Sequence, residues 1–247
     1  MEIEALRQIN DLRDRWGRKM NVRHVLEAAP ALVVTFALSI MAVFAAPLPA
    51  RADAPKPITL VAFGDSLTAG YGLKASESFP AQLQMALQAK GYKVMIVNAG
   101  VSGDTTADGL RRFDWAMQPK PDGVILELGA NDALRGIDPK EPSANLDKML
   151  SALKSKGIDV LLTGMKAPNN WGEDYAKAFD AIYTDLAAKY GVTLYPFFLD
   201  GVALDPAFSQ PDGLHPTASG IAEVVKRITP DVEALIQRIS QRKTAAN

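Results

Sequence analysis

Short apolar runs alternate with longer amphipathic stretches five times along the chain, and this alternation limits the folds available to it. The apolar runs cover residues 58–63, 93–97, 123–128, 159–162 and 193–197. Several of them carry Val, Ile and Leu on successive residues, which is typical of strands buried on both faces of a parallel sheet. We therefore expect five strands with helices packed on both sides of their sheet.

The stretches between these runs have the period of amphipathic helices. Leu146, Met149, Leu150 and Leu153, for example, share one helical face. Glycines that suit the left-handed end of a helix follow three stretches, at Gly91, Gly157 and Gly191. We expect helices over residues 79–90, 105–117, 143–156, 174–190 and 217–239. This pattern predicts a doubly wound, flavodoxin-like α/β/α sandwich of three layers, with a five-stranded and mostly parallel sheet.

The composition narrows the chemistry available to the chain. It has 247 residues with 27 basic and 28 acidic side chains, a formal charge of -1 and no long block of one sign. A nucleic-acid partner is therefore not expected. The chain has no cysteine, which excludes a thiol nucleophile, zinc-thiolate sites and disulfides.

The N-terminal part of the chain, residues 1–54, differs from the rest. Basic residues precede an apolar run over residues 28–46, and small residues follow around Ala52 and Ala54. That order is typical of a secretory signal. We expect this part to be an N-terminal extension and signal peptide, cleaved near Ala52 or Ala54. Residues 55–247 would then be one catalytic domain, exported to the periplasm or secreted.

Two alternatives stay open for the N-terminal part. An uncleaved membrane anchor needs about 20 apolar residues, and residues 31–46 are short of that length unless residues 47–50 are included. The mixed-charge stretch ahead of the basic region also allows translation to begin at Met20 instead of Met1.

Small and polar turn residues follow three predicted strands and precede the last predicted helix. They form the segments Gly64-Asp65-Ser66-Leu67, 98–104, Gly129-Ala130-Asn131-Asp132 and Asp212-Gly213-Leu214-His215. In sheets of this kind, ligands bind outside the carboxyl ends of the strands. The four segments are therefore expected to converge on one cleft.

Three of these residues together predict a serine hydrolase. His215 is the only histidine apart from His24, and Asp212 stands three residues before it. A carboxylate at that offset can accept from one ring nitrogen and leave the other as a base. Ser66 needs such a base to become a nucleophile. Taken singly, Ser66 fits a turn cap equally well and a lone histidine is more often structural. The G-x-S-x-G elbow of α/β hydrolases is absent.

The four segments resemble, in order, the four sequence blocks of the GDSL-type or SGNH hydrolase superfamily. The blocks correspond to Gly64-Asp65-Ser66-Leu67, Gly103, Gly129-Ala130-Asn131-Asp132 and Asp212-Gly213-Leu214-His215. Longer strings are similar to the periplasmic thioesterase I type, which also acts as an arylesterase and lysophospholipase. These strings cover residues 64–73, 98–110, 126–136 and 194–198.

The resemblance implies a role for each matched residue. It makes Ser66 the nucleophile, His215 the general acid and base, and Asp212 its orienting carboxylate. The oxyanion hole would consist of the backbone N–H groups of Ser66 and Gly103 and the side-chain amide of Asn131. Preorganised donors of this kind are worth about 3 to 4 kcal/mol each. The reaction would pass through an acyl-enzyme on Ser66 and would need no cofactor or metal.

Several nearby residues have a simpler interpretation. Asp65 and Asp132 are a pair of acids that could indicate a glycosidase or a metal site, but each is flanked by small turn residues and fits a local loop hydrogen bond. Gly103 also fits a turn into a helix, with Asp104 as the N-cap. Arg135 fits either a loop cap or a headgroup contact, and the sequence does not decide between them.

The substrate is expected to be a small acyl ester or thioester, bound by a monomer that meets membranes only through the signal segment or lipid substrates. Apolar loop residues after the third and fourth strands are candidates for an acyl groove, or simply cover the sheet edge: Leu134, Ile137, Ala167, Pro168 and Trp171. A carbohydrate O-deacetylase of the same superfamily would keep all four blocks. A non-catalytic flavodoxin-like binding module is disfavoured because the first loop lacks a Gly-rich phosphate cradle.

Overall fold

The computed structural model describes residues 56–245. The expected signal peptide, its cleavage near Ala52 or Ala54 and the choice between Met1 and Met20 lie outside the described residues. Within residues 56–245, no helix combines the length and the apolar character needed to cross a membrane.

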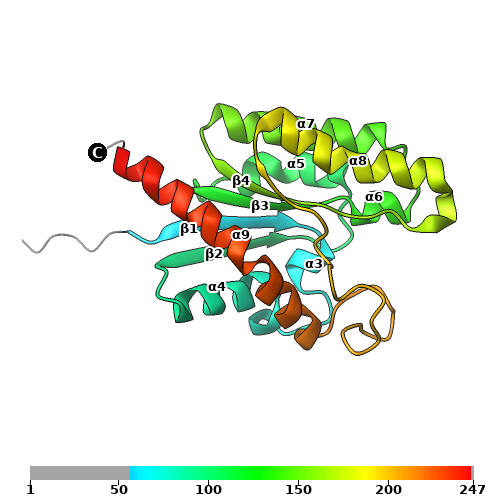
Figure 1. Cartoon of the computed structure of the whole chain (residues 1–247), viewed down its shortest axis with the longest axis horizontal. Helices are drawn as coiled ribbons and strands as arrows, with labels where there is room; N and C mark the ends of the chain where they lie inside the picture. Colours follow the sequence, from blue (N-terminus) through cyan, green and yellow to red (C-terminus); the bar gives the residue numbers. More distant parts are fainter. Residues whose placement is uncertain (1–55, 246–247) are drawn as a thin grey trace, which may run out of the picture. The chain divides into compact units, whose positions relative to one another are not determined.

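Five parallel strands form one sheet in the order β2-β1-β3-β4-β5 (Figure 1). They are β1 (Ile58–Gly64), β2 (Val94–Gly100), β3 (Gly123–Glu127), β4 (Asp159–Thr163) and β5 (Thr193–Tyr195). The chain moves outward from β1 to β2 and then passes back over β1 to β3, so its direction reverses beside β1. Ligands bind at such a reversal, outside the carboxyl ends of the strands. The predicted doubly wound fold is confirmed.

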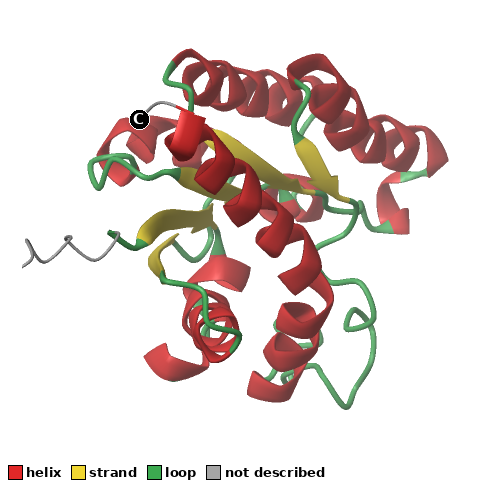
Figure 2. Ribbon diagram, turned by 60° about the vertical axis from the view of Figure 1, so that its left-hand side comes forward, coloured by secondary structure: helices red, strands yellow, loops and turns green. Residues whose placement is uncertain are grey.

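Helices cover both faces of the sheet (Figures 1 and 2). One face carries α4 (Phe79–Ala89) and α9 (Ala218–Ala245), and the other carries α5 (Thr106–Ala116), α7 (Lys140–Ser155) and α8 (Glu173–Tyr190). The strands β1, β3 and β4 are mostly apolar because both of their faces are buried, whereas the edge strand β2 exposes Met95 and Asn98. Their fully buried side chains include Leu60, Phe63, Ile125, Leu126, Leu161 and Leu162.

Two helix boundaries differ from the prediction by more than one residue. Helix α7 begins at Lys140 instead of residue 143 because Pro142 lies in its first turn, where the missing backbone N–H would have no partner in any case. Helix α9 continues to Ala245, beyond its last buried residue, Ile239. The additional turns carry Arg242, which pairs with Asp159. They bury no apolar face, so the sequence shows no helical period there.

Four short elements were not expected. They are α3 (Ser66–Ala69) and α6 (Ala130–Leu134), and two 3₁₀ turns, η1 (Ala75–Glu77) and η2 (Asn169–Trp171). Each is too short to show a helical period in the sequence. Helices α3 and α6 follow β1 and β3, and they carry two of the predicted site segments.

Strand β2 meets helix α3 at Gly100. A Cβ atom at this position would lie 2.3 Å from the backbone nitrogen of Ala69 and 2.8 Å from the carbonyl oxygen of Asp65. Backbone atoms cannot move aside as a flexible side chain can. Glycine at this position therefore lets the end of β2 approach the turn that carries Ser66.

We expect Gly100→Ala to lower the free energy of unfolding by about 1 to 3 kcal/mol, as overpacking of a tight contact does. Thermal unfolding followed by circular dichroism measures the change. Ser102→Ala is the matched control, because Ser102 is exposed two residues away. An unchanged melting temperature in Gly100→Ala would show that the contact is not tight.

Candidate active site

Ser66 lies in a sharp turn between β1 and α3. Asp65 is the N-cap of the helix, and its Oδ1 accepts a hydrogen bond from the backbone N–H of Leu67 at 3.0 Å. Gly70 ends the helix in a left-handed conformation with φ 85°. Only 8% of the Ser66 surface is exposed. The turn therefore holds the Ser66 side chain in one place, at the carboxyl edge of the sheet.

His215 joins Ser66 and Asp212 in one chain of hydrogen bonds. Its Nε2 lies 2.9 Å from Ser66 Oγ, and its Nδ1 lies 2.7 Å from Asp212 Oδ2. The other carboxylate oxygen of Asp212 accepts from the backbone N–H groups of Leu214 and His215 at 2.9 and 3.0 Å. Asp212 thus fixes both the backbone and the ring of His215, and the structure brings together the three residues predicted from the sequence.

These contacts decide the charge of Asp212. Hydrogen bonds from the backbone N–H and ring of His215, and from the Leu214 N–H, lower the pKa of Asp212 from 3.8 to about 2. The carboxylate is therefore ionised at neutral pH. An ionised Asp212 favours the tautomer with its proton on Nδ1, which leaves Nε2 able to accept a proton from Ser66.

An aromatic contact with the imidazole of His215 was not predicted from the sequence. The ring of Tyr71 lies against the His215 ring, with centroids 4.5 Å apart and planes tilted by 38°. Tyr71 follows helix α3 in a loop and is 53% exposed. An isolated aromatic residue in a loop has no periodic signal, so only the structure reveals this neighbour.

Asn131 and Gly103 follow β3 and β2, the two strands that flank β1, which precedes Ser66. The Asn131 amide nitrogen donates to Asp65 Oδ2 at 3.2 Å and to the carbonyl oxygen of Asp104 at 3.0 Å. Gly103 has a left-handed φ of 86°, and its carbonyl oxygen accepts from Arg135 at 2.9 Å. Arg135 therefore holds the loop that carries Gly103.

Helix α5 has a different cap from the expected one. Thr105, and not Asp104, is the N-cap, and it forms a capping box with Asp108. Asp104 instead pairs with Arg112 at 2.5 Å. The prediction of Asp104 as the cap was wrong because a threonine with an acid three residues later provides two reciprocal hydrogen bonds.

The two uncertain acids are buried and bound by local donors. Asp132 accepts from the backbone N–H and the hydroxyl of Thr106 at 2.8 and 2.7 Å, which ties α6 to α5. Burial raises the pKa of Asp132 and raises that of Asp65 to about 6. Within residues 56–245, no three His, Cys, Asp or Glu residues are grouped as metal ligands would be.

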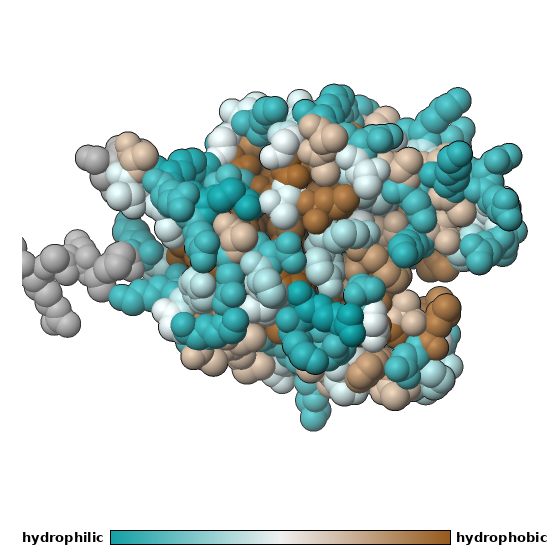
Figure 3. Space-filling model, viewed as in Figure 1, coloured by the Kyte–Doolittle hydropathy of each residue, from teal (hydrophilic) through white to brown (hydrophobic). Residues whose placement is uncertain are grey.

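An apolar groove of about 420 Å³ opens beside Ser66 and His215. Three of the predicted groove residues line it, namely Leu134, Ala167 and Pro168. Other lining residues include Leu67, Met165, Lys166, Phe197, Leu199, Ala203, Leu204 and Leu214. Hydrophobic side chains gather at the end of the molecule where the loop between β5 and α9 lies (Figure 3). The loops contribute most of this wall and have no periodic pattern, which is why these residues were missed.

The other two predicted groove residues do not line the groove. The indole nitrogen of Trp171 donates to the carbonyl oxygen of Ala133 at 2.9 Å, and its ring covers Gly136, where a Cβ would lie 2.7 Å from it. The carbonyl oxygen of Ile137 accepts from Tyr175 at 2.9 Å. Both residues brace the loop behind the groove.

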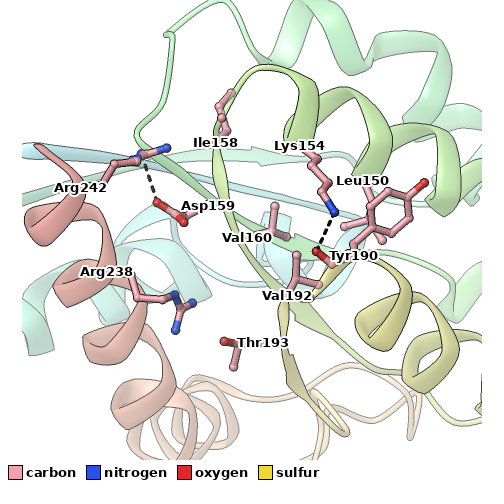
Figure 4. Close-up of a pocket in the computed structure, with 12 residues that line it drawn as sticks. Leu150, Lys154, Ile158, Asp159, Val160, Tyr190, Val192, Thr193, Arg238 and Arg242 are labelled. Atoms are coloured by element: carbon pink, nitrogen blue, oxygen red, sulfur yellow. Dashed lines mark hydrogen bonds and ion pairs between the residues drawn. The ribbon is translucent and has the colours of Figure 1, made fainter. Parts of the chain in front are cut away.

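A second cavity of about 310 Å³ lies at the opposite edge of the sheet (Figure 4). Its charged side chains are spread around the walls: Arg242 pairs with Asp159 at 3.1 Å, and Lys154 donates to the carbonyl oxygen of Tyr190 at 3.5 Å. Its described walls include no histidine or serine. The candidate active site is therefore the groove beside Ser66.

Comparisons with known proteins agree with this site. The sequence model of the GDSL-like Lipase/Acylhydrolase family matches residues 62–222. An arylesterase from Vibrio mimicus is 44% identical over 158 residues, which cover 64% of this chain and 79% of the relative. The thioesterase 1/protease 1/lysophospholipase L1 of Escherichia coli K12 is 38% identical over 183 residues, which cover 74% of this chain and 86% of the relative.

The fold is also similar to solved structures. The crystal structure of AlinE4, an SGNH-hydrolase family esterase, matches with a TM-score of 0.63 and 48% identity, and the match covers 73% of this chain and 97% of that one. The matched family region contains all four predicted sequence blocks. The chain therefore belongs to the GDSL-like lipase/acylhydrolase family and is an ester-hydrolysing serine hydrolase.

Proposed function

We propose that this enzyme cleaves acyl esters or thioesters with Ser66 as nucleophile, His215 as general acid and base, and Asp212 as the carboxylate that orients His215. The carrying observation is the continuous chain of hydrogen bonds from Asp212 through the imidazole to Ser66 Oγ. In that arrangement the serine and its base lie within proton-transfer distance.

The reaction has two halves. Ser66 Oγ attacks the acyl carbon while its proton passes to His215 Nε2, and His215 then protonates the alcohol or thiol that leaves. In the second half, water gives a proton to the same nitrogen as it attacks the acyl-enzyme. The tetrahedral intermediate collapses, His215 returns the proton to Ser66, and the carboxylic acid leaves.

The oxyanion is bound by the backbone N–H groups of Ser66 and Gly103 and by the Asn131 amide. Asn131 already donates both amide hydrogens, to Asp65 and to the carbonyl oxygen of Asp104. Binding of the oxyanion therefore requires that one of these bonds be shared or exchanged. The longer bond, 3.2 Å to Asp65, is the weaker of the two.

The acyl group occupies the apolar groove. The candidate substrates are aryl esters, acyl thioesters and lysophospholipids. The groove favours a hydrocarbon chain because aliphatic and aromatic side chains form most of its wall. A carbohydrate O-deacetylase would need hydrogen-bonding groups there for a sugar. Membership of an ester-hydrolysing family removes the reason for considering a non-catalytic flavodoxin-like module.

The enzyme acts after export, as a monomer, with residues 55–247 as its single catalytic domain. Residues 1–54 serve as an N-terminal extension and signal peptide that is removed near Ala52 or Ala54. The basic, apolar and small-residue order of that segment supports this proposal.

Ser66→Ala is expected to lower kcat for p-nitrophenyl octanoate by about 10⁴-fold or more, because the nucleophile of a serine hydrolase has no substitute. Ser151→Ala, an exposed serine in helix α7, is the matched control and should retain its activity. Circular dichroism checks that both variants are folded. Full esterase activity in Ser66→Ala would refute the proposed nucleophile.

Asp212→Asn is expected to lower kcat by about 10⁴-fold. The amide favours the wrong tautomer of His215, and it cannot stabilise the positively charged imidazolium that forms during the reaction. KM should change little, since Asp212 does not line the groove. Asp205→Asn, in the same exposed loop, serves as the control. Equal losses in the two variants would mean that the loop, and not the carboxylate, matters.

Substrate preference is tested with p-nitrophenyl acetate, octanoate and palmitate beside an acetylated sugar. Each methylene buried in the groove contributes about 0.8 kcal/mol, or about fourfold in kcat/KM, so octanoate should exceed acetate. Leu134→Ala should reduce that preference, whereas Met85→Ala, an exposed residue of helix α4, should not. Preference for the acetylated sugar would favour the deacetylase alternative.

A further inference from the structure

Glu127 is a buried acid directly beneath the turn that carries Ser66. It is the last residue of β3 and is 0% exposed. Its Oε2 accepts a hydrogen bond from the Thr68 hydroxyl at 2.7 Å and a longer one from the backbone N–H of Asp65 at 3.4 Å. Its Oε1 has no hydrogen-bond partner among the described residues. The carboxyl group therefore contacts Asp65, the residue before Ser66, and Thr68, the second residue after it.

The same carboxyl group occupies the space beside Gly64. Gly64 is paired with Glu127 in the sheet register, and a Cβ on Gly64 would lie 2.4 Å from Glu127 Oε2 and 2.2 Å from Thr68 Oγ1. The glycine before Asp65 therefore leaves room for the Glu127 carboxyl. One side chain thus links the end of β3 to the end of β1 and to helix α3.

No described cation pairs with Glu127. Arg112 of helix α5 reaches the carbonyl oxygen of Gly64, and its other hydrogen bonds go to Asp104 and to the carbonyl oxygen of Ala99. Tyr183 of helix α8 faces the same region, and its hydroxyl donates to the carbonyl oxygen of Leu128 at 2.9 Å. A charged Glu127 would be fully buried with one short hydrogen bond, from Thr68, and no counter-ion, which is unfavourable.

Asp65 is the second acid of this buried group. Burial and the neighbouring charge of Asp65 raise the pKa of Glu127 well above its usual value. Asp65 has more support for a negative charge, because Leu67 and Asn131 both donate to it. The surrounding charges act on it in opposite directions: His215 lowers its pKa and Asp132 raises it. When two acids share a buried site, the one whose charged form is better hydrogen-bonded ionises first.

We propose that Glu127 is a positioning residue that works as an uncharged carboxylic acid. It holds helix α3 against the end of β3, and it leaves the negative charge of the buried pair to Asp65, which orients the Asn131 amide. This inference rests on the proposed function, because Ser66 and Asn131 are the groups being positioned.

An uncharged Glu127 in the folded protein makes the free energy of unfolding depend on pH, which a purely structural role would not do. In the unfolded chain Glu127 ionises near its ordinary pKa of 4.5, whereas the folded protein keeps its proton to a higher pH. The free energy of unfolding, compared with that of a protein with a permanently neutral residue at this position, therefore falls as the pH rises from 4.5 toward the raised pKa. The unfolding equilibrium constant changes by up to about tenfold for each pH unit in that window.

The first test compares Glu127→Gln with the wild-type enzyme. Glutamine is neutral at every pH, so the melting temperature of the variant minus that of wild type should increase between pH 5 and pH 8. Glu141→Gln, an exposed acid of helix α7, should not show this trend. A difference that is constant or falls with pH would overturn the proposal.

A second measurement is made on the wild-type enzyme and uses the variant only to assign a resonance. Carboxyl ¹³C NMR of wild-type enzyme labelled at glutamate should show one resonance that titrates far above the others and is absent in Glu127→Gln. Titration of every glutamate near its ordinary pKa would overturn the proposal even if Glu127→Gln does not fold.

Glu127→Ala separates positioning from substrate binding. Loss of the Thr68 and Asp65 contacts should lower kcat by about tenfold or more and leave KM nearly unchanged, as expected when transition-state interactions are weakened. A change confined to KM would contradict a role in positioning Ser66 and Asn131. Failure of the proposed function would appear separately, as an active Ser66→Ala enzyme with the NMR titration unaffected.

Discussion

The turn from β1 into α3 depends on one buried carboxylate, that of Asp65. One of its oxygens caps the helix that begins with Ser66, and the other accepts from the Asn131 amide. A side chain with 0% exposure therefore joins the proposed nucleophile to a proposed oxyanion donor from a neighbouring strand. Gly100 makes the arrangement possible, because only glycine lets β2 approach the backbone of this turn.

Four acids near the site carry out different tasks because their surroundings differ. Asp212 is partly exposed and bound by three N–H groups, which lower its pKa to about 2 and keep it charged. Asp65 and Asp132 are buried and each accepts two hydrogen bonds, whereas Glu127 is buried with one short hydrogen bond at 2.7 Å, a longer one at 3.4 Å and an Oε1 without a partner among the described residues. The charge of each carboxyl group follows from burial and from the number of donors that reach it.

The groove depends on a different kind of structure from the rest of the site. Ser66, Asn131 and Gly103 follow strands, so the sheet fixes their separations. The groove wall comes mainly from irregular loops, including the segment that carries Leu204, a residue with φ 65° and 91% exposure. Loop side chains can change without disturbing the sheet, so the shape of such a groove can change while the residues at the strand ends stay in place.

The sequence by itself determined the fold class and indicated the proposed reacting residues. Strands buried on both faces are mostly apolar, so their positions along the chain and their alternation with helices could be read directly, and Asp212 and His215 are only three residues apart. The tertiary structure decided what depends on contacts between distant segments. It placed Ser66 beside His215 across 149 residues of sequence, and it stacked Tyr71 on the imidazole. It also moved Trp171 and Ile137 out of the groove wall and put Glu127 beneath the Ser66 turn. These contacts could not be predicted because the residues that make them are not related by any periodic pattern in the sequence. Only the packing of the sheet and its loops sets the distances between them.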